Sequence, residues 1–146
     1  MLKRILLAAV VAAVSAGPAL AQGTCGALPI APALPTPAEI QQKSPADALA
    51  ANHNGFKDIK RWQADLKDYR SCLDSQTNSD KRDLSNAQGE SKPDQDKIKG
   101  IQAEIAQTSQ SYDASVDAEE HMVNEFHAML TAYCMRKDVD RTSCPK

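Results

Sequence analysis

The fold is decided by residues 91–137, which read SKPDQDKIKGIQAEIAQTSQSYDASVDAEEHMVNEFHAMLTAYCMRK. Apolar side chains recur in this stretch at spacings of three, four and seven, so they share one face of a single long helix. These positions are Ile98, Ile101, Ile105, Tyr112, Val116, Val123, Phe126, Leu130 and Tyr133. Their period is close to 3.5 residues, which favours a coiled coil, although Thr108 and Glu119 interrupt the stripe. A helix of about 46 residues is roughly 70 Å long, so it needs a partner helix from this chain or from another copy.

Both ends of this predicted helix have residues that are typical of helix termini. Ser91 is expected to cap the amino end, with Pro93 in the first turn and Asp94 three residues after the cap. Arg136 and Lys137 place positive charge beside the last carbonyl groups, as the carboxyl ends of helices favour. The predicted helix therefore covers about residues 92–137, and residues 138–146 form a C-terminal tail.

A second helix is predicted over about residues 45–87. Ser44 and Pro45 provide its cap, and an apolar stripe follows at helical spacing: Leu49, Phe56, Ile59, Trp62, Leu66, Tyr69 and Leu73. The charged residues of 57–70, Arg70 among them, are assigned to the opposite, solvated face. A turn at about residues 88–93 then pairs positions whose numbers sum to about 179, so that Leu66 meets Tyr112 and Trp62 meets Val116. The predicted fold class is all-α: a long antiparallel two-helix coiled-coil hairpin over residues 44–137, with an extended Pro-rich N-terminal arm.

That arm covers residues 22–43. Pro29, Pro32, Pro35 and Pro37 forbid a regular helix and favour extended chain, and the aliphatic side chains between them indicate that part of it lies on a surface. A flexible linker is the alternative. Residues 36–39 resemble a capping box, which predicts a turn or two of helix before Pro45. Because a two-helix hairpin has a thin core, we expect the arm to cover it, or a second copy to do so in a homodimer.

The first 21 residues have the features of a signal peptide. Lys3 and Arg4 precede an apolar run over residues 5–16, which is short for a membrane span, and residues 19–21 match a small-x-small cleavage site. We expect cleavage near Ala21 and Gln22 and a periplasmic or secreted protein; an uncleaved anchor is the alternative. The mature chain then holds 15 basic and 19 acidic residues. That balance argues against nucleic acid as a partner, and no later apolar run reaches the length of a membrane span.

Four cysteines, Cys25, Cys72, Cys134 and Cys144, follow the predicted cleavage site. An even number in an exported chain predicts two disulfides, for which three pairings exist. Extended chain after Cys25 can run back beside the first helix as far as Cys72, and Cys144 lies ten residues after Cys134. These spacings favour Cys25–Cys72 and Cys134–Cys144. Free or intermolecular thiols are the alternative, and the lack of a C-x-x-C spacing gives no support to a redox enzyme.

One cluster contains residues of the types that bind transition metals. His121 and Glu125 share a helix face, His127 follows, and Met122 and Met129 would suit copper. No H-x-x-x-H or H-E-x-x-H motif is present, so the favoured interpretation is solvated His and Glu side chains beside core Met residues. We predict no metal, no cofactor and no catalytic residue, because a helical hairpin offers no concave pocket for an enzyme.

The segment of residues 69–74, YRSCLD, together with an upstream cysteine and a Pro-rich arm, resembles uncharacterised small exported helical-hairpin proteins of Gram-negative bacteria. The resemblance covers most of the mature chain, although Cys134 and Cys144 depart from it. It implies an all-helical hairpin with an N-terminal cross-link, and it implies no activity.

The function predicted from these observations is contact with another protein, which the sequence does not identify, as a scaffold or envelope-associated subunit. Two alternatives are a periplasmic holdase chaperone and a copper- or zinc-binding protein that uses residues 121–135.

Overall fold

The computed structural model describes residues 24–144, and every regular element in this range is helical. α1 spans Pro37–Gln42, α2 spans Pro45–Gly89 and α3 spans Gln95–Cys134, and the short 3-10 helix η1 spans Arg141–Ser143. The prediction of an all-α fold is therefore confirmed. The predicted signal peptide, residues 1–21, lies outside the described residues.

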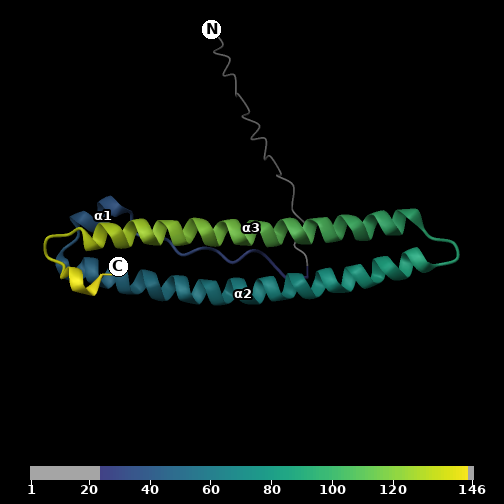
Figure 1. Ribbon diagram of the computed structural model, residues 1–146, viewed down its shortest axis with the longest axis horizontal. Coiled ribbons are helices and arrows are strands. Elements are labelled where there is room, and N and C mark those ends of the chain that lie inside the picture. The colour runs from purple at the N-terminus through teal and green to yellow at the C-terminus, as the bar shows by residue number, and fades with distance from the viewer. Residues whose placement is uncertain (1–23, 145–146) are drawn as a thin grey trace, which may run out of the picture.

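The two long helices, α2 and α3, lie side by side and form a rod (Figure 1). The chain reverses between them at residues 90–94, and residues 24–36, here called the arm, run along the rod between the two helices. No helix among the described residues is long and apolar enough to cross a lipid bilayer.

The amino end of α3 is set by Asp94 and not by Ser91. The Asp94 carboxylate accepts hydrogen bonds from the amides of Asp96 and Lys97 at 3.0 and 3.1 Å. This carboxylate satisfies amides that the first turn of a helix leaves free, so the helix begins three residues later than predicted. The Ser44 cap of α2 is as predicted, and its hydroxyl accepts from the Asp47 amide at 3.2 Å.

The carboxyl end of α3 also differs from the prediction, because the helix ends at Cys134 and not near residue 137. The Arg136 amide donates to the carbonyl of Tyr133 at 3.2 Å, which tightens the last turn. The Arg136 side chain then leaves α3 and binds the carboxyl end of α1, as described below.

Two clusters of buried side chains hold the helices together. One lies near the end of α3 and consists of Ile40, Ala48, Met129, Ala132 and Tyr133. The other lies further along the rod and consists of Ile59, Trp62, Leu66 and Met122. Leu34 of the arm packs against both clusters, so the arm contributes to the core.

The buried stripes agree with the prediction only in part. The predicted residues that are buried are Ile59, Trp62, Leu66 and Leu73 on α2 and Ile98 and Tyr133 on α3. Val116 is 43% exposed on α3, and Leu49 and Phe56 are 43% and 51% exposed on α2. In their place the small residues Ala48 and Gly55 are buried on α2, and Thr108, Ser115, Met122 and Met129 are buried on α3. The reason is that the core lies where α2, α3 and the arm meet, so both stripes are rotated toward the arm relative to a two-helix interface.

The register between the long helices differs as well. Three contacts define it: Phe56 with Phe126, Gln63 with Glu119, and Arg70 with Ser115. The numbers of each facing pair sum to 182–185, whereas the sequence predicted about 179. The reversal is centred between Gly89 and Gln95, later in the chain than predicted, and this shifts the facing positions on α3 by several residues at these three contacts.

Candidate functional site: the arm-free face and its polar bridge

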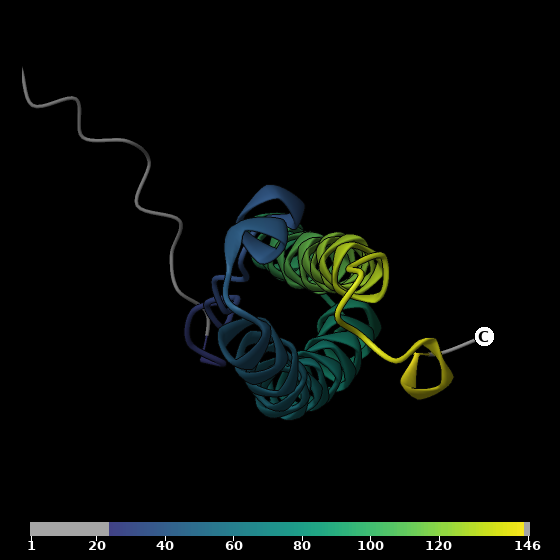
Figure 2. The ribbon, with the colours of Figure 1, turned by 90° about the vertical axis from the view of Figure 1, so that its left-hand side faces the viewer.

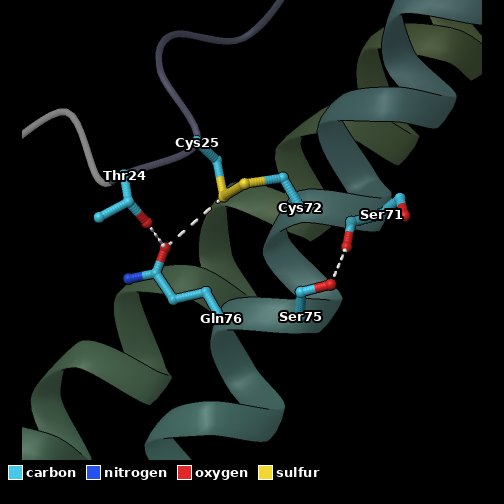
Figure 3. Close-up of a disulfide and its surroundings, with 6 residues drawn as sticks. All are labelled: Thr24, Cys25, Ser71, Cys72, Ser75 and Gln76. Atoms are coloured by element: carbon cyan, nitrogen blue, oxygen red, sulfur yellow. Dashed lines mark hydrogen bonds between the residues drawn. A yellow bond between two sulfur atoms is a disulfide. The ribbon is translucent and has the colours of Figure 1, made fainter.

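The arm is fastened to α2 along its length. Cys25 is bonded to Cys72, and the Gln76 side-chain oxygen accepts from the Thr24 hydroxyl at 2.9 Å and lies 3.6 Å from the Cys25 sulfur (Figure 3). Further along, the Trp62 indole donates to the carbonyl of Pro29 at 3.0 Å. These contacts close one side of the rod.

α1 continues that cover toward the end of the rod. It begins with the predicted capping box, in which the Thr36 hydroxyl accepts from the Glu39 amide and the Glu39 carboxylate accepts from the Thr36 amide. The Glu39 pKa is lowered, first by the backbone hydrogen bond from Thr36 and then by the bond from its hydroxyl. At the other end of α1, Arg136 donates to the carbonyls of Ile40 and Lys43 at 2.7 and 3.0 Å. These bonds satisfy carbonyl groups that the helix itself leaves free.

Arg136 is nearly fully buried, so its charge requires a partner. Asp138 supplies it, with the guanidinium 2.9–3.1 Å from the two carboxylate oxygens. The Asp138 pKa is lowered because its carboxylate accepts hydrogen bonds from Arg136. A disulfide between Cys134 and Cys144 closes the segment that contains both residues. The two disulfides are the two pairs that the sequence favours.

The opposite side of α2 and α3 carries no part of the arm. Seen along the rod, the arm and α1 lie to one side of the two long helices (Figure 2). Arg70 and Asp74 are each two residues from Cys72, which places them about 200° around α2 from the cross-link. We call this side the arm-free face, and the cross-helix contacts of Phe56, Gln63 and Arg70 lie along it.

A polar bridge of four side chains, Gln63, Arg70, Ser115 and Glu119, joins the long helices at this face. Arg70 donates to the hydroxyl and the carbonyl of Ser115, both at 2.7 Å, and to Glu119 at 2.6 Å. Gln63 donates to the second Glu119 oxygen at 2.8 Å. The Arg70 guanidinium also lies 5.9 Å from the centre of the Tyr112 ring.

The bridge holds Glu119 in its charged form. The pKa of Glu119 is lowered, mainly by the hydrogen bond from Arg70 and then by the bond from Gln63, while partial burial works in the opposite direction. The sequence pattern predicts that Arg70 lies on the solvated face of α2 and that Glu119 interrupts the apolar stripe of α3. Both assignments are wrong, because the register brings the two residues together between the helices.

Apolar side chains remain exposed on the arm-free face. The rings of Phe56 and Phe126 are 6.2 Å apart, and the Lys60 ammonium lies 5.7 Å from the centre of the Phe56 ring. Leu49 precedes Phe56 by seven residues and Val116 follows Tyr112 by four, so both belong to the same face. Further along, a shallow groove of about 220 Å³ lies between the helices, lined among others by Leu73, Lys81 and Tyr112.

The residues considered for metal binding are only partly brought together. His121 lies 3.3 Å from Glu125 on the exposed surface of α3, whereas His127 is six residues away and on another face. Met122 and Met129 are buried in the two core clusters, so their thioethers are not available beside the imidazoles. Among residues 24–144, no three His, Cys, Asp or Glu side chains gather closely enough to hold a metal ion.

The buried polar residues of this site could have been found from one signal in the sequence. Thr108, Ser115, Met122 and Met129 follow one another at intervals of seven, the repeat of a coiled-coil stripe. Glu119 lies next to the stripe that these four residues form. A carboxylate at the edge of a buried stripe needs a polar partner, which the other helix can provide. Apolarity alone could not reveal this, because two of the four residues are hydroxyl-bearing.

Comparison of the chain with protein-family models, with curated proteins and with solved structures gives no match.

Proposed function

We propose that this is an exported, disulfide-linked helical protein that acts by contact with another protein, as a scaffold or as an envelope-associated subunit. The observation that carries the proposal is the difference between the two sides of the rod. The arm and α1 cover one side, while the other keeps Leu49, Phe56 and Val116 exposed by 43%, 51% and 43%. Exposed apolar side chains gathered on one face of a protein are typical of a binding surface.

We further propose that α2 and α3 form an antiparallel coiled-coil hairpin, with the arm as a third, extended layer. The seven-residue spacing of the buried side chains on α3 and the facing pairs along the rod support this arrangement. In such a hairpin the arm takes up one groove between the helices and leaves the other groove for a partner.

Export is part of the proposal. The basic start, the short apolar run and the small-x-small site in residues 1–21 support it, and so do two disulfides, which persist in oxidising compartments. The test is to express the full chain in a Gram-negative host and to sequence the amino terminus of the periplasmic product. A terminus at Gln22 is the expected result, and retention of the intact chain in the cytoplasm contradicts it.

Protein contact is tested by photo-crosslinking in cells that make the protein naturally. Phe56 is replaced by p-benzoyl-phenylalanine, an aromatic residue of similar shape, and Arg61 is replaced in a control because it is 78% exposed on another side of α2. Illumination should give a discrete cross-linked band from position 56 and none from position 61. If positions 49, 56 and 116 all give no band, the protein does not act through this face.

A further inference from the structure

The charges along the arm-free face are segregated between the two long helices. On α2, the face carries the exposed Lys60 and Lys67, while Arg70 is already paired with Glu119 and Asp74 is the one acidic residue placed there. On α3, residues 100–135 contain no Lys or Arg. Asp113 and Glu120 lie there within one turn of Val116. The α3 side of the face is therefore acidic, and the α2 side is basic around Lys60 and Lys67.

This pattern matches a second copy of the same chain. We propose that two copies associate through their arm-free faces about a two-fold axis that runs along the rod, which places α2 of each copy against α3 of the other. The inference rests on the proposed function, because it names the occupant of that face. The product is a four-helix bundle with the two arms on its outer sides.

The direction of the axis follows from the charges. With the axis along the rod, a residue of α2 meets the same level of α3 that it meets within its own chain, where facing numbers sum to 182–185. Lys67 of one copy then lies level with residues 115–118 of the other, between Asp113 and Glu120. An axis across the rod would instead lay α3 on α3 and bring acidic residues against acidic residues.

The same arrangement covers the exposed apolar side chains. Phe56 of one copy, at the level of residues 126–129, lies against the α3 segment that carries Val123 and Phe126 in the other. Apolar contact at the centre with opposite charges on either side is the usual organisation of a stable interface between helices.

The experiment uses two charge reversals on the mature, oxidised protein, with mass measured by light scattering across a dilution series. Lys67→Glu places two acids together across the interface, and Glu120→Lys places two bases together, so each variant should dimerise at least about tenfold more weakly than the wild type. A mixture of the two variants should restore the dimer, because both contacts between unlike copies then join opposite charges. Arg61→Glu, the same change of charge on another side of α2, should dimerise like the wild type.

The outcomes separate this inference from the proposed function. A wild-type monomer, or a dimer that Lys67→Glu does not weaken, overturns the inference, as does a mixture that stays monomeric. The photo-crosslinker at position 56 then decides the rest. Where the dimer forms and the charge reversals act as expected, a band at twice the mass of the chain supports both proposals. A band of another mass overturns the second copy as occupant but keeps protein contact, and no band from any of positions 49, 56 and 116 overturns both.

Discussion

Arg136 donates a hydrogen bond from its Nη1 to the carbonyl oxygen of Ile40 at 2.7 Å, which joins two residues that are 96 positions apart in the sequence. The guanidinium thereby connects the chain just after α3 to the end of α1, and Asp138 neutralises its charge in this nearly buried place. This side chain therefore helps to hold α1, together with the burial of Ile40 in the core and a hydrogen bond from the Gln41 side chain to the carbonyl of Ala132.

Replacement of Arg136 should therefore release α1. We expect Arg136→Ala to lower the free energy of unfolding by about 2–3 kcal/mol, because it leaves the buried carbonyl of Ile40 and the part-buried carbonyl of Lys43 without this donor. Denaturant unfolding gives the stability, and hydrogen exchange should show loss of protection in α1. The matched control is Lys137→Ala, which removes an exposed charge and should change stability by less than about 0.5 kcal/mol. Full protection of α1 in Arg136→Ala would contradict the assignment.

The Cys25–Cys72 cross-link should control the environment of Trp62, the single tryptophan of the chain. Its indole donates to the arm, so the double variant Cys25→Ser/Cys72→Ser should shift the fluorescence emission of Trp62 to longer wavelength as the arm loosens. Stability should fall by about 2–4 kcal/mol. The double variant Cys134→Ser/Cys144→Ser removes the other cross-link and should leave the emission unchanged. Equal shifts in the two variants would mean that the arm is not held by its own disulfide.

The polar bridge predicts a pH dependence that belongs to Glu119. Its pKa in the folded protein is lowered by Arg70 and Gln63, so the stabilisation is fully present above the unfolded value of 4.5 and is lost as the pH falls through the folded value. At pH 7, Glu119→Gln should therefore cost about 1–2 kcal/mol, and the difference from the wild type should shrink below about pH 4.5. Glu39, Asp138 and Asp140 also have lowered pKa values, but they are present in both proteins and cancel in the comparison.

Urea titrations at a series of pH values measure this difference. Glu104→Gln serves as the control, since Glu104 is exposed on the same helix, and its difference from the wild type should be small at every pH. If the difference in free energy of unfolding between Glu119→Gln and the wild type stays constant down to pH 3, the charge of Glu119 is not what stabilises the bridge.

Two glycines inside the long helices should respond differently to the same substitution. Around Gly100 nothing lies within 4 Å of an added Cβ, so Gly100→Ala should stabilise the protein by about 0.5–1 kcal/mol through helix propensity alone. At Gly55 the added Cβ would lie 3.2 Å from both Leu34 and Met129, and these side chains must move. Gly55→Ala should therefore stabilise the protein clearly less than Gly100→Ala does, or should destabilise it. Thermal unfolding of the two variants measures the contrast, and equal gains would mean that the arm does not press against α2 at Gly55.

Helix period and capping residues were sufficient to predict the two long helices, the short helix after Thr36 and the all-helical class. They identified only part of the buried side of each helix: Ile59, Trp62 and Leu66 are buried as predicted, but other members of the stripe are not. Leu49 and Phe56 are more apolar than Ala48 and Gly55, so a stripe chosen by apolarity includes the wrong pair. The close approach of the arm requires small residues, and only the structure reveals where the arm lies.

The polar part of the site was harder to predict for a related reason. Arg70 resembles its exposed neighbours in a run of alternating charges, and nothing local distinguishes it from Lys67. Its role depends on Ser115 and Glu119, which are 45 and 49 residues away and become partners only through the register of the two helices. Because the predicted register was wrong by several residues, it did not bring Arg70 beside Ser115 and Glu119, and the polar bridge could not be predicted.

The connectivity of the cysteines has a consequence for how the protein matures. Each cysteine is bonded to its nearest neighbour along the chain, first with second and third with fourth, so the two covalent loops are consecutive and do not overlap. A chain whose thiols are oxidised in the order of their synthesis therefore reaches this pairing directly. For a chain oxidised in that order, we expect no wrongly formed bond that an enzyme would have to rearrange.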